Sequence, residues 1–232
     1  TTEVDPIHVE ISPGCENLDH RHCSLPYPSD RYLTEDGDTV TGYRLAFEPE
    51  FLPESVDADR FDFSPYERLD GASPATQTMV LWDSPADLTD AALEEDIGRS
   101  LEDDSPTVIV DLSTGAWIPH WVENDYRAQA DDETVLYIRL AGVLEEDHPY
   151  AVALRDMVDA DGEAFESSPA FAALRDGLPT DAEEIEDRRA GSEETFAILD
   201  AAGVERASLQ LARQSHTAPG DTPPRATLHL PP

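Results

Sequence analysis

The sequence predicts a mainly β protein: an antiparallel β-sandwich with an extended N-terminal segment before it and a C-terminal helical appendage after it. Short apolar or alternating runs recur between Gln77 and Glu166, separated by turn residues at the spacing of about ten residues that is typical of sandwiches. The N-terminal part of the chain is rich in proline, and helical patterns are concentrated in the last third. These observations together define the expected fold class.

Residues 1–76 are predicted to form an extended segment that contains a cysteine loop and a hairpin. Ile7, Val9 and Ile11 alternate with polar neighbours, which indicates a short strand. The sequence TEDGDT (34–39) carries an Asp-Gly turn between two apolar runs, which is typical of a β-hairpin. Prolines and turn residues between 48 and 75 predict a loop-like connection to the sandwich.

Residues 77–166 are predicted to form the sandwich itself. Strands are expected in TMVLW, PTVIVDL, DDETVLYIRLAG and HPYAVALRDMVD. Between the first two, TDAALEEDIGRSLED (89–103) predicts a short helix, because Thr89 can cap it and the acidic first turn suits the helix dipole. In the third strand, Val135, Tyr137 and Arg139 should face away from the even-numbered residues 136–140.

Residues 167–214 are predicted to form helices and a closing strand. Ser168 as a cap, Pro169 at the first helical position and Gly177 as a stop bound one helix. The sequence TDAEEIEDRRAGSEETFAILDAAG predicts a single longer helix, and ASLQLAR (207–213) predicts the closing strand. Residues 215–232 form a Pro-rich tail, which we expect to contact its own domain or a neighbour.

The charge of the chain is strongly negative: 15 basic and 51 acidic residues give a net charge of −36, and every basic residue is an arginine. Such a field repels nucleic acids and anionic membrane surfaces, so neither is expected as a partner. The charge is explained either by a solvated surface that keeps the protein soluble in a salty habitat or by a cation-binding role. No stretch reaches the ~20 apolar residues of a membrane span.

The segment CENLDHRHC (15–23) contains both cysteines of the chain. A Cys15–Cys23 disulfide would close a loop of nine residues and would indicate an oxidising compartment. A zinc site would use Cys15, His20, His22 and Cys23, but their spacing departs from the usual paired ligands, and adjacent His22 and Cys23 would point apart in an extended chain. The disulfide is therefore favoured over zinc or free thiols.

Two acidic turns, EDGD (35–38) and DADGE (159–163), are weak calcium candidates. An EF-hand loop needs an acidic residue at its first and twelfth positions, whereas Met157 and Ser168 occupy them when Gly162 is aligned with the loop glycine. Hairpin turns are the favoured interpretation, so no cofactor is predicted and calcium is the alternative. The carboxylates that could contribute to a surface calcium site are Asp36, Asp38, Asp159 and Asp161.

Aromatic residues gather around the sequence AWIPHWVENDY (116–126). If Trp117, Trp121 and Tyr126 were exposed, they could form a platform that binds sugars or peptides, with His120 between them. Packing in the core or at a sheet edge is the more common role of such residues, and His120 is then a structural histidine. Both interpretations remain open at this point.

A serine hydrolase of the α/β type carries Gly-x-Ser-x-Gly at a strand-to-helix elbow. The nearest sequence in this chain is GASPA (71–75), in which Pro74 and the neighbouring turn residues fit a loop better. Acidic residues are too numerous for a catalytic pair to be recognised from sequence. No catalytic residue is therefore predicted.

Several of these segments resemble known families. The sequences WDSPADLTDAAL, PTVIVDLSTG, ETVLYIRLAGVLEEDHPYAVALRD and MVDADGEAF resemble bacterial Ig-like domains of the surface-layer type, which implies an Ig-like topology for 77–166. The cysteine pair, LPYPSDRYL, LDGASPATQTMVLW and LQLA are similar to the N-terminal region of secreted bacterial lipase-like proteins over residues 15–214. A hydrolase domain would follow there, whereas this sequence continues as RQSHTAPGDTPP.

Taken together, these features predict a non-catalytic extracellular module for binding, display or assembly at the bacterial surface, as a structural or adhesive subunit. Edge strands and Pro-rich ends would allow strand addition between subunits, so a protein partner or self-assembly is expected. The alternative implied by the resemblance is an N-terminal accessory domain of a secreted lipase-like or esterase-like hydrolase, with that hydrolase as the adjoining domain. A third hypothesis is a hydrolase with a dispersed active site.

Overall fold

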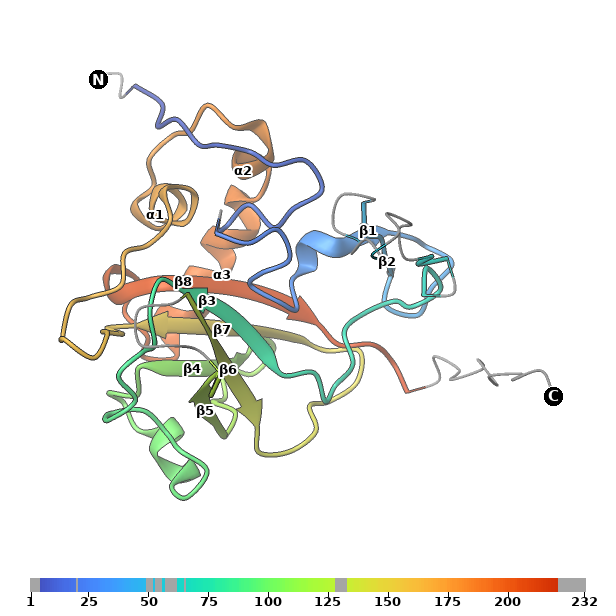
Figure 1. Cartoon of the computed structure of the whole chain (residues 1–232). Helices are drawn as coiled ribbons and strands as arrows, with labels where there is room; N and C mark the ends of the chain where they lie inside the picture. Colours follow the sequence, from blue (N-terminus) through green and yellow to red (C-terminus); the bar gives the residue numbers. More distant parts are fainter. Residues whose placement is uncertain are drawn as a thin grey trace.

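The computed structural model of this protein describes residues 5–19, 21–48, 52, 56, 62–64, 66–127 and 133–220, and it is mainly β, as predicted (Figure 1). The strands are β1 (Leu33–Glu35), β2 (Tyr43–Leu45), β3 (Thr78–Trp82), β4 (Thr107–Asp111), β5 (His120–Asn124), β6 (Thr134–Leu140), β7 (Pro149–Arg155) and β8 (Leu209–His216). The α-helices are α1 (Pro169–Asp176), α2 (Glu183–Asp187) and α3 (Arg189–Ala201). Short 3-10 turns are η1 (Asp30–Tyr32), η2 (Ile97–Leu101) and η3 (Arg206–Ser208).

The strands form three antiparallel sheets. Strands β1 and β2 make the predicted hairpin, and the other six form sheets in the orders β3-β6-β5 and β4-β7-β8. In central strand β6, Leu136 pairs with Val80 of β3, and Ile138 pairs with Val122 of β5. Leu136 and Ile138 are buried whereas Tyr137 is half-buried, which confirms the predicted alternation.

The two larger sheets share one apolar core. Trp82 of β3 is buried and stacks on the ring of Phe165, with 4.6 Å between the ring centroids. Val110 of β4 and Leu154 of β7 are fully buried in the same cluster. Because side chains from both sheets meet in a common interior, the arrangement is consistent with a β-sandwich.

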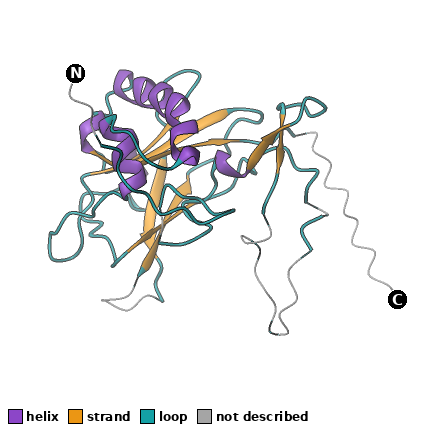
Figure 2. Ribbon diagram, turned by 90° about the horizontal axis from the view of Figure 1, so that it is seen from above, coloured by secondary structure: helices purple, strands orange, loops and turns teal. Residues whose placement is uncertain are grey.

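The helices belong to this core. They lie between β7 and β8 in the chain, and β8 then returns to pair with β7 (Figure 1). Figure 2 shows most of the helices gathered on one side of the strands. Phe171 of α1 and Phe196 of α3 pack edge to face at 6.0 Å and are buried with Leu199. The helical appendage expected from the sequence is therefore integrated, because α1 and α3 bury apolar side chains in the core that the sheets share.

Two helix predictions need correction. Residues 89–103 form turns and the short η2 instead of an α-helix: the backbone N–H and hydroxyl of Thr89 both donate to Asp87, so Thr89 closes a turn. The single long helix is divided into α2 and α3 at Arg188, whose side chain binds the buried Glu16. Ser168 and Gly177 bound α1 as predicted, the latter at φ 68°.

The N-terminal segment runs across the helices and does not form a complete strand. Within its described part, Ile7 makes a single parallel bridge to Thr180, and the backbone N–H of Val9 donates to Asp181. One residue in a ladder cannot define a strand, so the expected strand at 7–11 is reduced to this bridge. Of the Pro-rich tail, residues 221–232 lie outside the described residues.

Each outer strand of the two larger sheets has part of its free edge covered. Loop backbone groups bond to β3, β4, β5 and β8 from outside, and the residues that do so are Tyr27 on β3, Trp117 and Ile118 on β4, Ala92 on β5, and Ala72 on β8. An edge whose N–H and C=O groups are already engaged is a poor template for another strand. The geometry therefore disfavours the strand addition that the sequence suggested.

Candidate functional site

The cysteine loop is closed by a Cys15–Cys23 disulfide, as predicted. Both sulfur atoms are used in this bond, so the alternative zinc site is wrong. The Nδ1 atom of His22 lies 3.0 Å from the Ser24 hydroxyl oxygen, a local contact within the loop. His20, the remaining candidate ligand, lies outside the described residues.

The acidic turn at 35–38 is used for structure. One carboxylate oxygen of Asp36 accepts the backbone N–H of Asp38, and the other is 2.5 Å from Nε of Arg44. The side-chain hydrogen bond from Arg44 and the backbone hydrogen bond from Asp38 hold the pKa of Asp36 below its usual value. Asp36 is therefore occupied by a hairpin contact.

The second calcium candidate is also a turn. The Asp159 carboxylate accepts the backbone N–H groups of Asp161 and Glu163, and Gly162 has a φ of 83°. Such an Asx-type turn closes a hairpin without any cation. Across the part of the chain that the structure describes, no three His, Cys, Asp or Glu side chains gather in a way that could hold a metal ion.

The four aromatic-platform candidates are not brought together. His120 is completely buried: its Nε2 lies 2.9 Å from the Thr107 hydroxyl oxygen, and its Nδ1 is 2.8 Å from the Ile118 carbonyl. Burial lowers the pKa of His120 and outweighs these hydrogen bonds, which favour the charged form. Trp117 packs against the core and donates its indole N–H to the Ala202 carbonyl.

The other two candidates point elsewhere. Trp121 follows His120 on β5 and is half-buried on the opposite face of the strand. Tyr126 is 86% exposed, and Arg127 lies over its ring at 5.3 Å from the centroid. Alternation along β5 places His120 and Trp121 on opposite faces of the strand. The sequence could not show which of these faces would be buried in the core.

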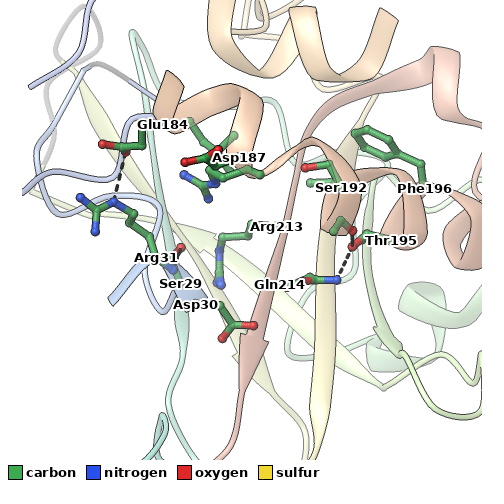
Figure 3. A pocket seen from close by; sticks show the side chains of 14 residues that line it. Ser29, Asp30, Arg31, Glu184, Asp187, Ser192, Thr195, Phe196, Arg213 and Gln214 are labelled. Atoms are coloured by element: carbon green, nitrogen blue, oxygen red, sulfur yellow. Dashed lines mark hydrogen bonds and ion pairs between the residues drawn. The ribbon is translucent and has the colours of Figure 1, made fainter. Parts of the chain in front are cut away.

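A charged pocket lies where three distant parts of the chain meet. It has a volume of about 380 Å³ and is lined by η1, by the junction of α2 and α3, and by residues 212–214 of β8 (Figure 3). Leu18, Phe196 and Ala212 supply its apolar surface. This volume falls in the range of small-molecule sites in proteins.

Ion pairs fix the walls of this pocket. Arg31 of η1 lies 3.1 Å from Glu184 of α2, and the side-chain amide of Asn17 donates to the same carboxylate (Figure 3). Arg188, at the junction of α2 and α3, pairs with Glu16 at 2.5 Å. The disulfide-closed segment is thereby tied to the helices that form the opposite wall.

Two carboxyl groups near the pocket have opposite pKa shifts. Burial works against the charged form of Glu16, but Arg188 outweighs it and lowers the pKa of Glu16. Burial raises the pKa of Asp30, although its carboxylate accepts the backbone N–H of His216. Glu16 has a direct ion pair, whereas Asp30 has none within the part of the chain that the structure describes, which explains the difference.

Arg213 is the least satisfied charged group at this site. Arg213 is only 3% exposed, and its Nη2 donates to the Thr78 hydroxyl at 2.9 Å. Its Nε and Nη1 are buried and have no hydrogen-bond partner among the described residues. Burial lowers its pKa to about 10, against the favourable charges of Glu16 and Asp30. A buried guanidinium with open donors is costly in free energy and uncommon in a purely structural role.

Two of the hydroxyl groups around the pocket, those of Ser29 and Thr195, are engaged in structural bonds. Ser29 donates to Glu16, and Thr195 donates to the Gly191 carbonyl while it accepts from the amide of Gln214 (Figure 3). Because the pKa of Glu16 is low, its carboxylate is a weak base toward Ser29. This arrangement is suited to holding a ligand more than to activating a nucleophile.

No pattern in the sequence indicates this pocket. Its arginines stand in unrelated sequences, SDR (29–31), EDRR (186–189) and LAR (211–213), and no motif joins them. The available signal was the rarity of basic residues: three of the 15 line this one pocket. Only the fold shows that they converge.

No protein-family model, curated protein or solved structure matches this chain. Among the helices that the structure describes, none has both the length and the apolar composition needed to cross a bilayer.

Proposed function

We propose that this chain is a non-catalytic extracellular binding module of the β-sandwich class, with an Ig-like core and its ligand site at the charged pocket beside β8. The observation that carries the proposal is the convergence of η1, the α2–α3 junction and β8 on a pocket that contains an incompletely bonded arginine. The Cys15–Cys23 disulfide supports an oxidising, extracellular or cell-surface location.

Binding is favoured over assembly by strand addition for the reason given above: loop backbone already covers part of every outer edge of the two larger sheets. Light scattering coupled to size exclusion tests this choice. A monomer of about the 25.5 kDa chain mass is expected. Filaments or sheets seen by electron microscopy of the same fractions would instead support a structural subunit.

Ester hydrolysis tests the non-catalytic part of the proposal. Wild-type protein and the matched variant Ser29→Ala are incubated with short-chain nitrophenyl esters. We expect both to release nitrophenol at the same slow, non-saturating rate, because the Ser29 hydroxyl is bonded to a weakly basic carboxylate. Saturable turnover by the wild type that is lost in Ser29→Ala would overturn the assignment.

A further inference from the structure

As far as the structure describes the chain, one positive charge at the pocket beside β8 has no ion-pair partner. Arg31 is paired with Glu184 and Arg188 with Glu16, whereas Arg213 has no carboxylate oxygen within ion-pair distance in the described part of the chain. A guanidinium presents a planar fork of donors that matches the two oxygens of a carboxylate. The open donors of Arg213 therefore indicate which ligand group would fit.

We propose that this pocket binds a small organic carboxylate and that Arg213 neutralises the charge of that carboxylate. The inference rests on the proposed binding function and adds the chemical class of the ligand. Leu18 and Phe196 provide apolar contacts for the body of the ligand, and Ser192 and Gln214 lie on the pocket wall as polar partners (Figure 3).

The ligand reaches Arg213 through a rotation of that side chain. Nε and Nη1 are buried behind the pocket wall, and Nη2 holds the guanidinium at Thr78. A rotation of the terminal torsions toward the pocket gives up one hydrogen bond to a neutral hydroxyl and gains a charge-assisted pair with the carboxylate. A carboxylate can accept two parallel hydrogen bonds from a guanidinium, so a bidentate pair would replace the single bond to Thr78.

The acidic residues at the pocket favour a single negative charge on the ligand. Glu184 is engaged by Arg31, but Asp30 and Asp187 also line the site. Both aspartates would repel a doubly charged phosphate more strongly than a ligand that carries a single negative charge. A cationic ligand would be attracted by the aspartates but repelled by Arg213, so benzylamine is the probe that competes with benzoate.

Matched probes test the inference on the full chain. Benzoate, benzyl alcohol and benzylamine share one ring and differ in charge, and acetate, hexanoate and inorganic phosphate extend the series. Titration calorimetry and thermal shifts at pH 7 are expected to show saturable binding of benzoate or hexanoate with a Kd of about 1 mM or below. Benzyl alcohol, benzylamine and phosphate should bind at least about tenfold more weakly.

Three variants locate the site. Arg213→Gln should weaken benzoate binding about ten- to a hundred-fold, and Ser192→Phe, at a half-buried helix position, should block the pocket while the fold is kept. The matched control Arg99→Gln, which removes an arginine that pairs with Glu102 outside the pocket, should change affinity less than about threefold. Ser192→Phe keeps the test decisive if Arg213→Gln does not fold.

The outcomes separate this inference from the proposed function. Tighter binding of benzylamine or phosphate would overturn the carboxylate assignment while a binding module remained supported. Equal benzoate binding by wild type, Arg213→Gln and Ser192→Phe would place the site elsewhere and overturn the inference. Failure of every carboxylate would also overturn it, whereas the non-catalytic assignment would fall only on saturable ester hydrolysis.

Discussion

Glu16 and Arg188 are 172 positions apart in the sequence and form an ion pair of 2.5 Å, with the Glu16 side chain completely buried. The pair joins the disulfide-closed N-terminal loop to the break between α2 and α3. Ser29 donates a further hydrogen bond to the same carboxylate. The buried Glu16 carboxylate therefore links three segments: its own loop, η1 through Ser29, and the α2–α3 junction through Arg188. The folding of these segments is coupled through that one charge.

Removal of one partner of this pair should be strongly destabilising. Arg188→Met leaves the buried Glu16 carboxylate without its counter-charge, so we expect the free energy of unfolding to fall by about 3 to 5 kcal/mol. Guanidinium unfolding at pH 7 measures this loss. In the matched double variant Glu16→Gln/Arg188→Met, most of the stability should return, and equal losses in both variants would contradict a dominant charge effect.

The carboxylate of Glu186 should contribute pH-dependent stability. Its hydrogen bonds with Arg189 and Thr180 lower its pKa to about 2 in the folded protein, from 4.5 ordinarily. Because the folded pKa is depressed, the contribution is complete above about pH 4.5 and is lost as the pH falls toward 2. Solvent screening limits its size to about 1 kcal/mol or less, since the side chain is 36% exposed.

Comparison with Glu186→Gln isolates this effect. Urea unfolding of both proteins should show a stability difference at pH 6 that shrinks between pH 4.5 and pH 2. A difference that stays constant over this range would show that packing, and not the charge of Glu186, is responsible.

His120 should also make stability fall in mild acid, in a different pH window. Its folded pKa lies below the ordinary 6.5 because the ring is buried, so the unfolded chain binds the proton more readily. Stability should decline as the pH falls below about 6.5 and continue to do so until the folded pKa is reached. A proton NMR titration of the folded protein should give a His120 pKa below 6.5. A pKa at or above that value would show that burial does not control the protonation of this ring.

The disulfide should stabilise the fold moderately. It closes a loop of nine residues, for which the chain-entropy relation gives about 2–3 kcal/mol. The variant Cys15→Ser/Cys23→Ser should therefore lose about that much free energy of unfolding, measured without reductant. As a control, reductant should shift the wild type toward the stability of the variant and leave the variant itself unchanged.

Gly71 should not tolerate a side chain. A Cβ atom at this position would lie 2.6 Å from the backbone nitrogen of Ala218, at the contact of residue 72 with the end of β8. Gly71→Ala should cost about 1–3 kcal/mol because backbone must move. The control Gly37→Ala, with no neighbour within 4 Å of the new atom, should change stability by less than about 0.5 kcal/mol.

The predictable parts of this fold were those that local chemistry determines. Alternation located β6, a strand of β-branched residues located β4, and the Ser168 cap with Gly177 bounded α1. The helix at 89–103 failed because Asp87 captures both donors of Thr89, a competition that periodicity does not report. The break at Arg188 coincides with an ion pair to Glu16, which lies at the other end of the sequence and leaves no local pattern.

The candidate site could not be predicted for the same reason. A pattern within a few residues can indicate a disulfide loop or a hairpin, and both were found where the sequence placed them. The pocket is created by contacts between residues far apart in the chain, and the role proposed for Arg213 rests on donor atoms that have no hydrogen-bond partner among the described residues. Neither the pocket nor the surroundings of Arg213 can therefore be recognised from the sequence alone.

The order of the pocket-forming segments has a consequence for biosynthesis. One wall comes from residues 16–31, and the last contributions come from residues 212–214 of β8. A nascent chain therefore cannot complete the pocket until β8 has left the ribosome and paired with β7.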